Sequence, residues 1–85
     1  MGTSALNVDA STLIGEGGVK LLVALYMGAA NIEEVVRLSG LDERVARAKF
    51  NMLQELELVR ERKGKISLSS KGKAMLKKAI LEYLR

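Results

Sequence analysis

The sequence feature that most constrains the fold of this chain is a change in the spacing of its apolar residues near residue 58. In residues 31–57 apolar side chains recur every three or four positions, which predicts helices because an α-helix has 3.6 residues per turn. In residues 58–68 the period changes to that of paired strands on either side of Lys63-Gly64. With further helical stretches on both sides, the pattern predicts a mostly helical α+β domain that contains one hairpin.

Two helices are expected before this change, at residues 32–38 and 43–56. Asn31 opens the first with the spacing of a capping box, and Asp42 caps the second, because short polar side chains accept hydrogen bonds from free N–H groups at a helix start. Gly40 lies in the turn between them, where glycine ends a helix at little cost. Two short helices joined by a three-residue turn form a helix-turn-helix.

The hairpin is expected at residues 58–68, directly after the second helix. A two-residue loop at Lys63-Gly64 would pair Val59 with Leu68 and would place most of the basic residues of the two strands on the outer face.

A single domain is expected over residues 13–85, because a chain of 85 residues has room for one small core. Its core helix is expected at 18–28, after a flexible glycine-rich start, and its last helix at 70–84. Residues 1–12 are small and polar, and we expect them to be loosely ordered. The aromatic residues lie in apolar stripes and are expected in the core: Tyr26, Phe50 and Tyr83.

The composition excludes several kinds of chemistry. The chain contains no cysteine and no histidine, so it lacks disulfides, thiolate metal sites and the commonest general base. Its acidic residues are scattered, with no pair of carboxylates placed for acid–base work. We therefore expect no enzyme, no metal site and no cofactor. The most apolar run, residues 21–30, is shorter than the ~20 residues that cross a bilayer, so we expect a cytoplasmic protein without membrane contact.

Charge is divided unequally along the chain. Residues 1–57 carry five basic and eight acidic side chains, a net charge of −3. Residues 58–85 carry nine basic and two acidic side chains, a net charge of +7. The hairpin and the last helix therefore form a positive pole that favours a partner with phosphate groups.

Three blocks of the sequence, taken in order, resemble winged helix repressors of the MarR and ArsR kind, and with them small archaeal and viral winged helix proteins. They are IEEVVRLSGL at residues 32–41, FNMLQELELV at 50–59 and ISLSSKGK at 66–73. In that family the first block is the positioning helix with its turn, the second leads from the recognition helix into the wing, and the third ends the wing and begins a helix. The resemblance implies a winged helix-turn-helix with a three-helix core, a β-hairpin wing and a C-terminal helix, and it implies binding of double-stranded DNA.

The chain departs from the family pattern in two places. Glu57 stands where the family usually has glycine, so we expect the bend between recognition helix and wing to be made in another way. The long flanking helices through which many such repressors dimerise are also absent. A homodimer is still expected. Two of its candidate interface residues exceed what one small core needs, and four belong to the apolar stripe of the last helix: Leu21 and Leu25, and then Leu76, Ile80, Tyr83 and Leu84.

The second helix, at residues 43–56, is the candidate recognition helix. One face carries the side chains that we expect to enter the major groove: Glu43, Arg44, Arg47 and Asn51. Arginine can donate two hydrogen bonds to guanine, and asparagine can pair with adenine in a similar bidentate way. The alternative is a solvated helix face decorated with charge, and the acids Glu43 and Glu55 lower its positive potential.

The wing places like charges opposite one another. In the expected register Arg60 lies across from Ser67 and Arg62 across from Lys65, with Lys63 at the tip. Like charges across a hairpin destabilise it unless an anion relieves them, and DNA phosphate is the natural candidate. The candidate phosphate contacts, two of them on the following helix, are Arg60, Arg62, Lys63, Lys65, Lys71 and Lys73. The alternative is a soluble hairpin whose lysines only prevent strand-to-strand aggregation.

Two functions of different classes remain open from the sequence. The first is a transcriptional regulator or architectural protein, associated with the nucleoid, whose homodimer places two recognition helices in successive major grooves of duplex DNA. The second is a protein-interaction module within a larger replication, transcription or membrane-remodelling assembly, because the same fold also serves that role.

Overall fold

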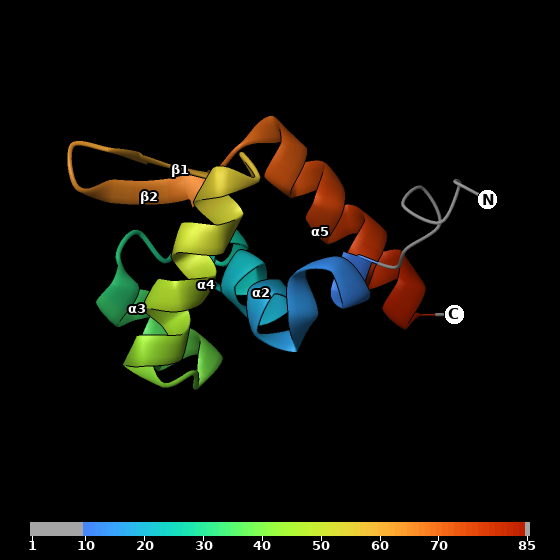
Figure 1. The fold of residues 1–85 in the computed structure, drawn as a ribbon, viewed down its shortest axis with the longest axis horizontal. Helices are drawn as coiled ribbons and strands as arrows, with labels where there is room; N and C mark the ends of the chain where they lie inside the picture. Colours follow the sequence, from blue (N-terminus) through green and yellow to red (C-terminus); the bar gives the residue numbers. More distant parts are fainter. Residues whose placement is uncertain (1–9, 85) are drawn as a thin grey trace.

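The computed structural model describes residues 10–84 (Figure 1). This part of the chain forms a small α+β fold, mostly helical, with four helices and one two-stranded antiparallel hairpin that projects from them. In chain order the elements are α2 (Ala10–Tyr26), α3 (Ile32–Ser39), α4 (Glu43–Glu55), β1 (Val59–Arg62), β2 (Lys65–Leu68) and α5 (Ser70–Tyr83). Helices and strands follow one another in the predicted order.

Side-chain caps set the starts of α3 and α4, as predicted. The Asn31 side chain accepts a hydrogen bond from the backbone N–H of Glu34 at 2.8 Å. The Glu34 carboxylate reaches back and accepts from the N–H of Ala30 at 2.7 Å, which makes a capping box displaced by one residue. Gly40 ends α3 in the left-handed conformation, and the Asp42 carboxylate caps the first turn of α4.

The hairpin has the predicted register. The facing residues are Val59 and Leu68, Arg60 and Ser67, Glu61 and Ile66, and Arg62 and Lys65. Lys63 and Gly64 form the loop with φ values of 52° and 81°, and a positive φ at both positions is the geometry that matches the twist of a hairpin. The N–H of Ile66 donates to the carbonyl of Ala30 at 2.9 Å, so β2 is also tied to the loop between α2 and α3.

The first described helix differs from the one predicted at residues 18–28. α2 runs from Ala10 to Tyr26, so the glycine-rich segment lies inside the helix and does not form a flexible start. The helix is interrupted at Gly15, where φ is 79° and ψ is 164°.

Burial of Ile14 explains why helical structure extends so far toward the N-terminus. Its side chain is buried in the core and lies against Gly18, one turn further along α2. Of the segment expected to be loosely ordered, residues 10–12 are therefore helical, and residues 1–9 lie outside the described residues.

The bend between α4 and β1 is made by Glu57 itself. Its φ is 64°, so this glutamate adopts the left-handed conformation that glycine takes at lower cost. The Ser69 hydroxyl donates to the carbonyl of Glu57 at 2.6 Å and accepts from the N–H of Gly72 at 2.9 Å, which joins the bend to the start of α5. The expectation that the bend is made in another way is wrong. Glu57 itself adopts the left-handed conformation that a glycine at this position would adopt.

α2 is the central helix of the core and contacts α3, α4, α5 and β2. Because it is covered on several sides, the core uses its apolar residues Leu21 and Leu25. Leu21, Leu25 and Leu76, three of the six residues predicted at a dimer interface, lie buried in this core, so their assignment to an interface is wrong.

The C-terminal part of α5 exposes apolar side chains that the core does not use. Ile80, Tyr83 and Leu84 are exposed, and so is Leu81, which was not among the predicted residues. Tyr83 and Tyr26 were expected in the core but are 89% and 71% exposed. Each tyrosine is the last residue of its helix, so fewer neighbouring residues cover it.

Candidate nucleic-acid interface

α4 presents the predicted side chains on its exposed face. Ala46, Phe50 and Leu53 lie on the opposite face and are buried against the core. Helical spacing then directs the side chains of the other face toward solvent. The residues predicted to enter the major groove are all exposed: Glu43, Arg44, Arg47 and Asn51. The orientation of this face is therefore set by the packing of α4.

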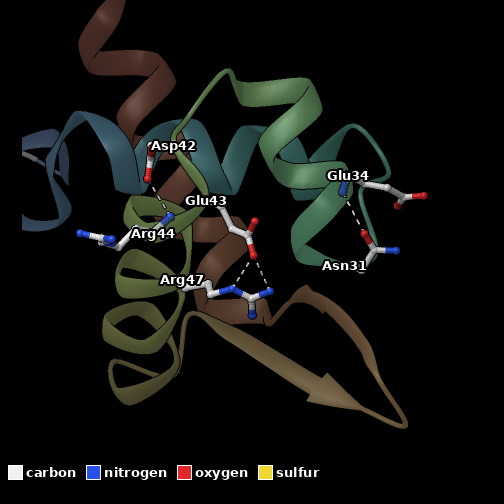
Figure 2. A network of polar contacts seen from close by, with 6 residues as sticks. All are labelled: Asn31, Glu34, Asp42, Glu43, Arg44 and Arg47. Atoms are coloured by element: carbon white, nitrogen blue, oxygen red, sulfur yellow. Dashed lines mark hydrogen bonds and ion pairs between the residues drawn. The ribbon is translucent and has the colours of Figure 1, made fainter.

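Glu43 and Arg47 form an ion pair on this face (Figure 2). Arg47 donates through Nε at 3.0 Å and through Nη2 at 2.8 Å to a single oxygen, Oε2 of Glu43. The two residues are four positions apart and so are neighbours on the helix surface. The side chain of Arg44 points away from this pair. Of the two predicted arginines, only Arg47 is therefore partnered by a carboxylate of the same helix.

A groove of about 510 Å³ lies between α3, α4 and the hairpin. Arg47 and Asn51 line it from α4, and the acidic residues Glu33 and Glu61 line it from α3 and β1. Gln54 also lines this groove. The inner side of the candidate interface therefore combines amides with both signs of charge.

The outer face of the hairpin carries positive charge alone. Arg60, Arg62, Lys63 and Lys65 are all exposed. Arg62 and Lys65 lie directly opposite one another across the two strands. Among the residues that the structure describes, none of these four side chains forms an ion pair with a carboxylate.

A second hollow, of about 470 Å³, lies where α4, β1 and the start of α5 meet, and it is lined by Arg60 and Lys71 together with the acidic Glu57. Lys73 is exposed but does not line this hollow. Gln54 lines both this hollow and the groove beside the hairpin. The sequence places Gln54 on the same helical face as Asn51, a spacing that could have identified it as a further candidate.

Other kinds of site are not found in the described part of the chain. It holds no cluster of three acidic residues suited to a metal ion, and none of its helices is long and apolar enough to cross a bilayer. Comparison with models of known protein families gives no match, and comparison with curated proteins gives none. Fold and surface together define a small α+β domain with a basic hairpin, an arrangement consistent with a winged helix.

Proposed function

We propose that this chain is a winged helix-turn-helix protein that binds double-stranded DNA, as a transcriptional regulator or architectural factor associated with the nucleoid. The observation that carries the proposal is the hairpin, on which Arg62 faces Lys65 beside Arg60 with no carboxylate of the described residues to pair them. Such an arrangement lowers the stability of an isolated hairpin and favours a bound polyanion. The protein is proposed to act by binding, without catalysis.

The two parts of the interface have different tasks in this proposal. The hairpin and Lys71 contact phosphates, which supply affinity and salt dependence but no sequence information. α4 enters the major groove, where Arg44 and Asn51 contact base edges. Two copies are proposed to associate through the exposed apolar end of α5, and the proposed dimer places its two α4 helices in successive major grooves.

A titration with duplex DNA tests the proposal. Fluorescence anisotropy with a labelled duplex of random sequence should show binding that weakens steeply as salt rises, with a slope of about −0.9 in log K against log salt for each phosphate neutralised. Absence of binding at micromolar protein and about 50 mM salt would contradict the proposal.

A protein-interaction role is the second candidate, and the groove beside the hairpin favours it. The acidic residues Glu33 and Glu61 that line that groove suit a basic segment of another protein better than they suit DNA. In this case Arg60→Glu combined with Arg62→Glu would leave partner binding intact. In the DNA-binding case the same double variant would abolish duplex binding.

A further inference from the structure

The Glu43–Arg47 ion pair lies on the face of α4 that we propose to enter the major groove. A carboxylate in such a place repels phosphates, so it opposes the affinity that the hairpin provides. Its partner Arg47 is held at the same time, because both of its hydrogen bonds end on Oε2 of Glu43. For binding to arbitrary DNA, the pair is therefore a disadvantage.

The pair leaves hydrogen-bonding groups unused. An arginine side chain has five N–H donors, and Arg47 uses Nε and Nη2 on Glu43. Oε1 of Glu43 accepts no hydrogen bond from the residues that the structure describes. Both side chains are about 60% exposed, so the free groups point into solvent rather than into the core. The pair thus presents one acceptor beside several donors.

A C·G base pair presents the complementary pattern in the major groove. Cytosine offers its N4 amino group as a donor, and guanine offers O6 and N7 as acceptors beside it. Glu43 can accept from cytosine N4 while the remaining donors of Arg47 reach guanine. Arg47 then keeps its hydrogen bonds to Glu43. The remaining polar atoms of both side chains exchange hydrogen bonds with water for hydrogen bonds with the base pair.

We propose that the Glu43–Arg47 pair is a specificity element that lowers affinity for arbitrary duplex DNA and selects a C·G base pair where α4 enters the major groove. The proposal rests on the DNA-binding function proposed above. It makes Glu43 a residue that selects sequence, although its charge opposes binding.

Glu43→Gln tests the proposal, with Glu55→Gln as the matched control. Both substitutions remove one negative charge from an exposed position of α4, but only the first removes the partner of Arg47. Both side chains are exposed, so the effect on affinity is small: Glu43→Gln should bind random duplex about 1.5- to five-fold more tightly than wild type. In selection from a random duplex library, wild type and Glu55→Gln should share an enriched C·G position that Glu43→Gln loses.

The outcomes separate this inference from the function on which it rests. If wild-type protein does not bind duplex DNA, the proposed function fails. If wild type binds but Glu43→Gln keeps the C·G position, or if wild type selects A·T or no base there, the proposed function stands and this inference is wrong. Circular dichroism of each variant verifies that α4 is intact, as expected since the Asp42 cap is unchanged.

Discussion

Gly72, in the first turn of α5, lies against the backbone of Leu58, the residue just before β1. A Cβ atom at this position would overlap the carbonyl oxygen of Leu58. That oxygen is fixed by a hydrogen bond from the N–H of Ser69 at 3.0 Å, so it cannot move aside freely. We expect Gly72→Ala to lower the free energy of unfolding by about 2–3 kcal/mol, measured by urea denaturation.

The control for this prediction is Gly17→Ala in α2. There the added Cβ would meet no backbone atom: its nearest neighbours are the Lys49 side chain, with Cε at 3.3 Å, and Cδ2 of Leu41 at 3.8 Å. Replacing glycine by alanine inside a helix normally stabilises it by up to about 1 kcal/mol, so Gly17→Ala should be neutral or stabilising. Equal destabilisation by both substitutions would show that the Leu58 oxygen is not the cause.

Glu57 holds a backbone conformation that costs a non-glycine residue about 1–2 kcal/mol. Glycine relieves this cost but loses more conformational entropy on folding, so we expect Glu57→Gly to stabilise the protein by about 0.5–1 kcal/mol. Glu57→Gln is the control, because it removes the charge and keeps the side chain. Thermal unfolding should rank Glu57→Gly above Glu57→Gln, and the reverse order would contradict the prediction.

The like charges across the hairpin lower its stability, a cost that the proposed DNA binding accounts for. Arg62→Glu places a carboxylate directly opposite Lys65 and replaces a repulsive pair by an attractive one. We expect the variant to be more stable than wild type by about 0.2–1 kcal/mol and to bind duplex DNA more weakly. Thermal unfolding measures the expected gain in stability, and anisotropy titration measures the expected loss of DNA affinity. Changes of stability and affinity in the same direction would contradict the prediction.

Lys77→Glu controls for the change in net charge. It makes the same change in net charge at an exposed position of α5, outside the surface proposed to contact DNA. Its loss of DNA affinity should be smaller than that of Arg62→Glu. Equal losses would mean that overall charge, and not the hairpin, determines binding.

Elements that depend on local signals were predictable from the sequence. The caps of α3 and α4 and the hairpin register follow from nearby residues, and the structure has them as predicted. The start of α2 was not predictable, because it depends on the burial of Ile14 among distant parts of the chain. The Glu43–Arg47 pair was missed although its four-residue spacing is the signal for such a contact.

The two ends of the molecule carry the two proposed binding surfaces. The hairpin lies at one end of the long axis and the C-terminal end of α5 at the other (Figure 1). Association through α5 would therefore leave both hairpins open to DNA. Leu21 and Leu25 could not be excluded from this interface by sequence alone, because the sequence does not reveal how many neighbours cover α2.

Self-association is predicted to depend on the exposed end of α5. Light scattering of concentrated wild-type protein should report a dimer. The double variant Ile80→Ser with Leu84→Ser should be a folded monomer, because both side chains are exposed within one copy and the core does not need them. Leu21→Ser, by contrast, should unfold the chain, since that side chain is buried. A wild-type monomer at high concentration would contradict the proposed dimer.

The salt dependence of duplex binding tests most directly whether the hairpin contacts phosphate. Anisotropy titrations at several salt concentrations should give a steep linear fall of log K with log salt for the wild-type protein. Replacing Arg60 and Arg62 together by glutamine should reduce the magnitude of that slope by about 1.8, which corresponds to two lost phosphate contacts. A slope unchanged by the double substitution, or a wild-type protein that leaves duplex DNA unbound at low salt, would contradict the role assigned to the hairpin.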